Sequence, residues 1–414
     1  MSIVRTIIVS SLLCAMVSVS VFGAAVPAAS AAVSGVPTAI ADPAGTPASK
    51  ESGRTVLPPL NLPSVSKAMA GLPNKEATAA LVFVGTPTQS WMGATGVSDI
   101  RTGAPARADG RFRIGSITKI FTAAVVLQLA AEGKVDLDKP IQSYLPGLLP
   151  ESYPSIQVGQ LLNYTSGLPS PKLPDGVEEA DLPGIQWTPE EVVRLAATQP
   201  MEFEPGTRQH YANINYFLAG LLIEAVTGNT YETEVESRII TPLRLYDTYL
   251  PGSDVRILGT HALGYQAVEQ DGKPQLVDVT EGSQSFTWAA GQIISTTSDL
   301  DTFMTSLFRG QLLPEDQLQH MFTVPNVTAW SADGKDAGPA TMSMGMSRAV
   351  INGITFWGKT GARPGYANGM FATRDLERRV VYSVNSTDAK GAGENKLGMR
   401  IAMSAFGVLP QSSP

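Results

Sequence analysis

Hydrophobic residues recur along this chain in short runs whose spacing predicts strands near both ends. The runs at residues 81–84 and 91–95, separated by a Gly-Thr-Pro turn, predict a strand pair. Three further runs predict strands near the other end of the chain: residues 354–357, 368–373 and 379–384. The pattern therefore indicates a sheet that draws strands from both halves of the sequence.

Helical patterns fill the middle of the chain. Residues 117–132 are apolar on nearly every side and end at a glycine, which predicts a helix buried in the centre of a domain. Residues 141–290 mix short helices with Pro- and Gly-rich loops, and the clearest element is a helix that begins near Tyr211 and closes at Gly228. Residues 395–406 predict a last helix. We expect an α+β fold, with one antiparallel sheet flanked by helices and a mostly helical lobe inserted.

Composition divides the chain into a targeting segment, a linker and one large folded unit. Residues 1–31 combine Arg5, an apolar stretch and an Ala-Ser-Ala site, which predicts a secretory signal peptide. Residues 32–63 contain six prolines and no hydrophobic period, so we expect an extended linker. Residues 64–407 show no further shift in composition and no repeat, and predict one domain followed by a tail at 408–414.

Charge and cysteine content exclude several classes of protein. The chain has 414 residues, of which 43% are hydrophobic, so it can bury a large core and is not a wholly disordered chain. Its net charge of −7 argues against a nucleic-acid partner. The single cysteine, Cys14, lies in the predicted signal peptide, which leaves the mature chain no thiol for catalysis, disulfides or metal binding. No later run is long enough to span a membrane, so we expect a soluble, exported protein.

Two short motifs carry residues that could act together on a substrate. Ser116 and Lys119, in Ser-Ile-Thr-Lys at the start of the buried helix, lie one helical turn apart. A partly desolvated lysine can accept the serine proton, and the free N-H groups of the helix start can stabilise negative charge on a reacting oxygen. Tyr211 and Asn213, in Tyr-Ala-Asn, supply a phenol that can shuttle a proton and an amide that can hold a carbonyl.

A third motif, Lys359-Thr360-Gly361, follows an apolar strand run, where a cation and a hydroxyl could bind a carboxylate. Each motif is short enough to occur by chance, and second copies of two of them occur at Ser64 and Tyr366. Taken singly, they have ordinary structural interpretations: a capping serine, a packed tyrosine, a lysine at a strand end. Their order along the chain favours a single site.

Other polar and aromatic residues are weaker candidates. His210, His261 and His320 lack the spacing of metal ligands. His210 precedes the Tyr-Ala-Asn motif and could tune its tyrosine, although a solvated loop histidine is the simpler interpretation. Trp288 and Tyr366 could line a cleft or pack in the core.

With these motifs in this order, the chain resembles the penicillin-recognising serine hydrolases. These comprise secreted serine D-alanyl-D-alanine carboxypeptidases, class C β-lactamases and related esterases. The likeness covers about residues 64–407 and is carried by five segments: residues 112–119, 161–168, 211–213, 291–295 and 358–361. It implies a β-lactamase/transpeptidase-like fold.

The resemblance also implies roles for individual residues. Ser116 would be the nucleophile, Lys119 its proton acceptor and Tyr211 the acid/base for the leaving group. Substrate binding would fall to five residues: Asn213, Lys359, Thr360, Gly361 and Ala362. Among these, Asn213 would hold the substrate amide, and the backbone N-H of Ala362 would form an oxyanion hole with that of the nucleophile.

The implied activity is that of a secreted, monomeric D-Ala-D-Ala carboxypeptidase that acts on peptidoglycan stem peptides through an acyl-enzyme, without metal or organic cofactor. β-Lactams would acylate the same serine. Many carboxypeptidases and esterases of this family carry histidine where Lys359 stands, whereas class C β-lactamases carry lysine. Together with Tyr-Ala-Asn, this shifts some weight towards a class C-like β-lactamase. An esterase and a D-amino-acid amidase also stay open. A non-catalytic cell-wall or β-lactam binding protein would not need an activated nucleophile.

Overall fold

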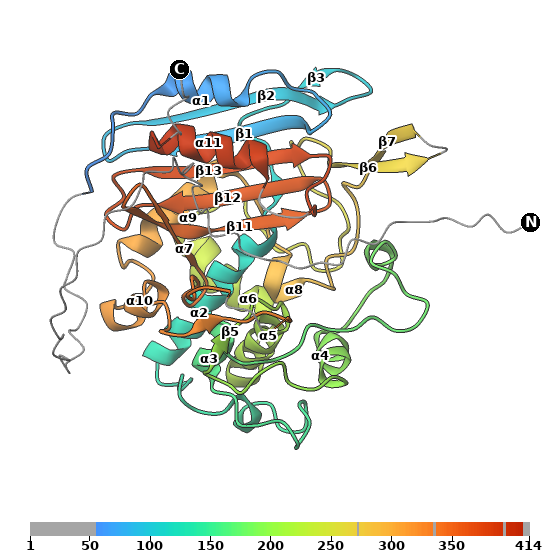
Figure 1. Cartoon of the computed structure of the whole chain (residues 1–414), viewed down its shortest axis with the longest axis vertical. Coiled ribbons are helices and arrows are strands. Elements are labelled where there is room, and N and C mark those ends of the chain that lie inside the picture. Colours follow the sequence, from blue (N-terminus) through green and yellow to red (C-terminus); the bar gives the residue numbers. More distant parts are fainter. Residues whose placement is uncertain (1–54, 271–272, 334–336, 392–394, 409–414) are drawn as a thin grey trace, which may run out of the picture.

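A seven-stranded antiparallel sheet forms the upper layer of the protein, whose computed structural model describes residues 55–270, 273–333, 337–391 and 395–408 (Figure 1). The strand order is β10-β11-β12-β13-β1-β2-β3. In chain order the strands are β1 (Ala77–Gly85), β2 (Ser90–Asp99), β3 (Ala104–Pro105), β10 (Ser347–Ile351), β11 (Ile354–Arg363), β12 (Tyr366–Ala372) and β13 (Arg379–Ser386). Because β1 pairs with β13, the two ends of the chain build one sheet, and the expected α+β fold is confirmed.

Strand β1 is buried along its whole length. Leu81 and Phe83 belong to the core that faces the helical lobe, whereas Val82 and Val84 belong to the core under the outer helices. Successive side chains of a strand point to opposite faces. A strand covered on both faces therefore needs an apolar residue at every position, which accounts for the unbroken run seen in the sequence.

Two terminal helices, α1 (Leu62–Met69) and α11 (Lys396–Phe406), cover the outer face of the sheet (Figure 1). Leu57 and Leu60 pack against the same core, and Val408 is buried in it. The folded part thus extends slightly beyond the expected boundaries at both ends, because isolated apolar residues bury there without forming a period. The predicted signal peptide and the linker up to residue 54 lie outside the described residues.

Helices fill the opposite side of the sheet, as Figure 1 shows. They are α2 (Thr118–Ala131), α3 (Val158–Leu162), α4 (Pro189–Ala197), α5 (Ile214–Thr227), α6 (Tyr231–Val235), α7 (Thr241–Leu243), α8 (Trp288–Gly291), α9 (Thr297–Phe308) and α10 (Glu315–Met321). Helix α5 closes at Gly228 as expected, but its predicted start near Tyr211 was wrong. Asn213 occupies the N-cap, so Tyr211 lies on the loop before the helix.

Short strand pairs bring loops of the lobe together. They are β4 (Phe112–Arg113) with β8 (Ile294–Ser295), β5 (Arg208–Gln209) with β9 (Thr328–Ala329), and the hairpin of β6 (Tyr265–Gln270) and β7 (Lys273–Asp278). Strand β4 leads directly into the 3-10 turn η1 (Gly115–Ile117), which continues into α2. Across the described ranges, no helix is both long and apolar enough to cross a membrane.

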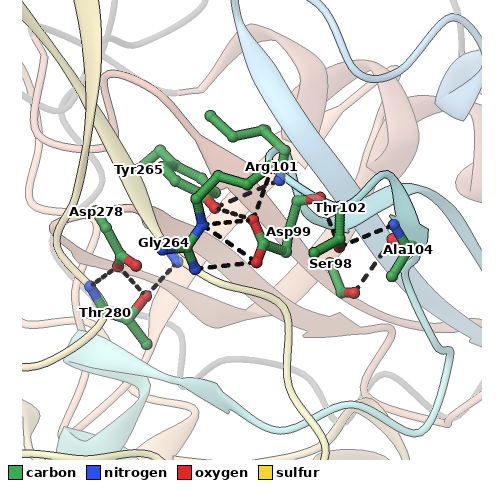
Figure 2. A network of polar contacts seen from close by, with 10 residues as sticks. Ser98, Asp99, Arg101, Thr102, Ala104, Gly264, Tyr265, Asp278 and Thr280 are labelled. Atoms are coloured by element: carbon green, nitrogen blue, oxygen red, sulfur yellow. Dashed lines mark hydrogen bonds and ion pairs between the residues drawn. The ribbon is translucent and has the colours of Figure 1, made fainter.

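A polar network ties the β6–β7 hairpin to the main sheet (Figure 2). The carboxylate of Asp99, at the end of β2, accepts hydrogen bonds from the Arg101 side chain and from the Tyr265 hydroxyl. The Arg101 guanidinium lowers the pKa of Asp99 to about 2. At the other end of the network, the Thr280 carbonyl accepts from Nε of Arg113, just before η1. The hairpin therefore supports the turn that carries Ser116.

Candidate active site

Turn η1 presents Ser116 at the start of the buried helix α2. The Ser116 residue stays partly exposed, whereas Lys119, one turn further on, is completely buried. Lys119 Nζ lies 3.1 Å from Ser116 Oγ, 2.8 Å from Asn213 Oδ1 and 2.7 Å from the carbonyl oxygen of Ala290. The amine is thus held by three segments that are far apart in the sequence.

Tyr211 approaches the same serine from the loop before α5. Its hydroxyl donates to Ser116 Oγ at 2.6 Å. Two amines face its ring, with Lys119 Nζ 4.9 Å and Lys359 Nζ 4.4 Å from the ring centre. An ammonium group over the face of an aromatic ring is attracted to the π electrons, so these contacts help to hold the ring in place. The ring of Tyr164 packs against Tyr211 with centroids 5.0 Å apart, which fixes its orientation.

The acceptors around Lys119 define what its amine can do. Asn213 Oδ1 and the Ala290 carbonyl can only accept hydrogen bonds, so they take up two N-H groups. A neutral amine then has its lone pair left for Ser116 Oγ, and a protonated amine has its third N-H there. The geometry therefore serves both halves of a proton transfer between Ser116 and Lys119 without rearrangement.

Strand β11 lines another side of the candidate site. Lys359 lies inside this strand, which runs on to Arg363 and is therefore longer than the apolar run at residues 354–357. Pairing between β10 and β11 stops at Gly358, and turn η1 approaches the strand beyond it. Lys359 is 3% exposed, and Thr360 is partly exposed. Lys359 thus brings a buried amine from β11 to the ring of Tyr211.

Turn η1 and strand β11 touch through their backbones. A Cβ atom added to Gly361 would lie 2.0 Å from the carbonyl oxygen of Ile114 and 3.0 Å from the backbone N of Ser116. One added to Gly115, whose φ is 56°, would lie 2.7 Å from the backbone N of Ala362. Only glycine fits such an approach. The amides of Ser116 and Ala362 therefore lie close together beside the serine hydroxyl.

Comparison with protein families identifies the group of proteins that shares this fold and these motifs. The Beta-lactamase family model matches residues 65–402. This chain belongs to the Beta-lactamase family. It is a serine hydrolase of the group that contains β-lactamases and penicillin-binding proteins, and the resemblance inferred from the motifs is confirmed.

Several relatives of this Beta-lactamase family member are hydrolases. A D-stereospecific amidohydrolase from Streptomyces sp. is 30% identical, with a TM-score of 0.72 over 84% of this chain and 98% of that one. A D-amino acid amidase from Ochrobactrum anthropi is 26% identical, with a TM-score of 0.70 over 83% and 97%. Esterase EstB of Burkholderia gladioli is 30% identical over 200 residues, which are 46% of this chain and 49% of the esterase. The chain spans about half the length of the curated relatives it matches.

Residues weighed as alternatives have other roles in this Beta-lactamase family fold. Ser64 belongs to α1, on the outer face of the sheet. Tyr366 and Trp288 are buried core residues, and the Tyr366 hydroxyl donates to the Ala262 carbonyl. His210 is not a solvated loop histidine, because Nδ1 bonds Glu202 and the ring packs on a tryptophan.

Two contributors to the site had no assigned role from the sequence. The Ala290 carbonyl acts through the backbone, so its side chain gives no signal. Tyr164 lies in the Leu-Leu-Asn-Tyr-Thr-Ser-Gly segment that contributed to the resemblance, yet its packing on Tyr211 depends on a loop conformation with φ of 61°. A bulky residue with positive φ is a sign of a position fixed by its surroundings.

Proposed function

We propose that this serine hydrolase is a D-alanyl-D-alanine carboxypeptidase that works through an acyl-enzyme on Ser116. The observation that carries the proposal is Ser116 Oγ, which lies between Lys119 Nζ at 3.1 Å and the Tyr211 hydroxyl at 2.6 Å. A hydroxyl between a base and a phenol has both a proton acceptor for attack and a proton donor for the departing group.

The proposed reaction has two steps. Ser116 Oγ bonds to the carbonyl carbon of the penultimate D-alanine while its proton passes to Lys119. The C-N bond then breaks, and terminal D-alanine leaves with a proton delivered through Tyr211. Water next attacks the ester, its proton returns to the serine, and the shortened peptide is released. The amides of Ser116 and Ala362 support the oxyanion in both steps because they lie together at the turn–strand contact.

We choose a carboxypeptidase over the other candidates because of the residues that strand β11 places beside Tyr211. A terminal D-Ala-D-Ala peptide carries a free carboxylate on its leaving group, whereas an amino-acid amide or simple ester does not. Lys359 supplies a nearly fully buried amine there, and we expect the partly exposed Thr360 to contribute its hydroxyl. A cation with little water around it binds a carboxylate more strongly than an exposed one. Asn213 would hold the amide of the bound peptide.

A D-amino-acid amidase is the second candidate. The similarity to the D-stereospecific amidohydrolase favours it, since that chain is covered over 98% of its length. The β-lactamase and esterase alternatives use the same serine chemistry and differ in the acyl group and in how quickly water clears the ester.

The test measures how fast the mature protein releases each of two leaving groups, D-alanine and ammonia. We expect D-alanine release from an acyl-D-Ala-D-Ala peptide to exceed ammonia release from D-phenylalanine amide. Lys359→Met should lower kcat/KM for the peptide by about 10-fold or more while changing the amide reaction little, since one charged hydrogen bond is worth about 1.5–3 kcal/mol. If the parent protein released ammonia from the amide faster, the protein would be an amidase and the carboxypeptidase assignment would be wrong.

Reaction with benzylpenicillin distinguishes a carboxypeptidase from a β-lactamase. Intact-mass measurements over time should show a penicilloyl adduct that persists for many minutes in the parent and is absent in Ser116→Ala. Hydrolysed penicillin without an accumulated adduct would indicate a β-lactamase. If Ser116→Ala retained parent activity on every substrate, the assignment of the nucleophile would be wrong.

We also propose that the chain is exported, on the basis of the segment at residues 1–31. N-terminal sequencing of protein secreted by an expressing bacterium should find Ala32 as the first residue. An intact Met1 on cell-associated protein would contradict this.

A further inference from the structure

Helix α8 contains a strained residue beside the candidate site. Trp288 has φ of 29°, a conformation that bulky residues avoid. Such a backbone is unfavourable and persists where the surrounding contacts hold it in place. Strain at a site is a reason to ask what the strained residue holds in place.

The strained turn presents carbonyl groups to helix α2. The Ala290 carbonyl accepts from Lys119 Nζ at 2.7 Å, and the neighbouring Ala289 carbonyl accepts from Thr122 Oγ1 at 2.7 Å. These contacts lie one turn apart on α2. The direction of the Lys119 amine towards Ser116 therefore depends on the conformation of the turn at Trp288.

A carboxylate on helix α6 fixes that turn from both sides. Glu232 Oε1 accepts from the indole Nε1 of Trp288 at 2.9 Å and from the side-chain amide of Gln292 at 2.8 Å. These two residues bracket the Ala290 carbonyl in the sequence. The indole also packs against Tyr231 with ring centroids 5.2 Å apart, and a Cβ atom on Gly220 would lie 2.6 Å from it.

We infer that Glu232 is a positioning residue for the reaction, acting through the Trp288–Gly291 turn to hold the Ala290 carbonyl on Lys119. The inference rests on the proposed role of Lys119 as the base. Glu232 itself touches neither Ser116 nor Lys119. Without its two hydrogen bonds the strained backbone can relax, and the carbonyl that orients the amine moves with it.

The test uses hydrolysis of p-nitrophenyl acetate, which reports on the nucleophile without depending on a D-amino acid. Glu232→Ala should lower kcat by about 10- to 100-fold with little change in KM, because displacement of a catalytic group by about 1 Å costs up to about 100-fold. Glu232→Gln keeps the acceptor oxygen and should stay close to the parent. Trp288→Phe keeps the ring, removes the indole N-H and should lose part of the rate.

Glu236→Ala is the matched control, since Glu236 is an exposed acid four residues further along. It should leave kcat unchanged. Thermal unfolding of every variant shows whether the protein still folds. A parent-like kcat in folded Glu232→Ala would overturn the inference, as would an equal loss in Glu232→Gln, which would point to charge rather than position.

A crystal structure of Glu232→Ala separates this inference from the proposed function. We expect Trp288 to leave its positive φ and the distance from Lys119 Nζ to the Ala290 oxygen to grow beyond hydrogen-bond range. An unchanged turn would overturn the inference even if the parent proved to be an amidase or an esterase. Failure of the carboxypeptidase assignment alone would leave the turn and its effect on Lys119 in place.

Discussion

Gly361→Ala tests the contact between turn η1 and strand β11 most directly. Gly361 has an ordinary strand conformation, so the substitution adds volume without backbone strain. The new Cβ would lie 2.0 Å from the carbonyl oxygen of Ile114. Carbon and oxygen atoms in close contact keep about 3.3 Å apart, so the turn and the strand must separate by about 1 Å.

This separation should affect catalysis more than folding. Overpacking of this kind costs about 1–3 kcal/mol of unfolding free energy. The amides of Ser116 and Ala362 lie on opposite sides of the contact, and the loss of one oxyanion donor lowers kcat by about 100- to 1000-fold. We therefore expect Gly361→Ala to fold, with a modest loss of stability and a fall in kcat of about 100-fold.

The assay combines initial rates on p-nitrophenyl acetate with urea unfolding. Gly184→Ala serves as the control, since Gly184 is exposed, lacks a positive φ and has no atom within 4 Å of an added Cβ. It should stay within about 0.5 kcal/mol of the parent. Parent-like kcat and stability in Gly361→Ala would refute the argument that the two amides are held by this backbone contact.

Three further predictions follow from single contacts. Tyr211→Phe removes the hydroxyl that donates at 2.6 Å to the serine and should lower kcat by about 100-fold or more at unchanged melting temperature, measured by steady-state rates and calorimetry. Asp301→Ala leaves the buried guanidinium of Arg379 without its carboxylate and should lower the unfolding free energy by about 3 kcal/mol; a loss below 1 kcal/mol would argue against burial of the pair. Arg238 lowers the pKa of Glu132 from 4.5 to about 2, so the stability that this carboxylate contributes is present above pH 4.5 and is lost as the pH falls towards 2. Melting temperatures of Arg238→Gln should therefore decline less steeply over this range than those of the parent, and parallel curves would contradict the assignment.

Periodicity in the sequence was enough to predict five of the seven strands of the sheet and the helices α2, α5 and α11, but not the short strand β3, the edge strand β10 or the outer helix α1. The apolar run of β1 and the helix α2 are buried on every side, so tertiary packing and local pattern agree there. The start of α5 was placed wrongly because Tyr-Ala-Asn carries no helix-breaking residue before Ile214. The strand containing Lys359 was predicted too short, since a strand with polar residues that face a site loses its apolar period.

The candidate site, too, could be predicted from the sequence only in part. Side chains with distinctive chemistry, such as Ser116, Lys119 and Tyr211, could be named from the sequence because their motifs lie in order. The Ala290 carbonyl could not, since a backbone group is placed by the conformation of its turn. Glu232 could not either, because its contact with Trp288 joins segments 56 residues apart, and nothing local connects them.

The distribution of contacts around Tyr211 explains how one fold can accommodate esterase, amidase and penicillin-binding relatives. On one side of its hydroxyl, Ser116 and Lys119 form a unit held by backbone and amide acceptors, which any acyl group can use. Lys359 faces the same ring from strand β11, where we propose that the leaving group binds. In the proposed mechanism, the nucleophile and its base thus come from η1 and α2, whereas the group that would recognise the leaving group comes from β11. A change at Lys359, away from the contact between Gly361 and η1, can alter the substrate without disturbing the nucleophile, so we expect substrate preference to depend on this part of β11 and not on η1 or α2.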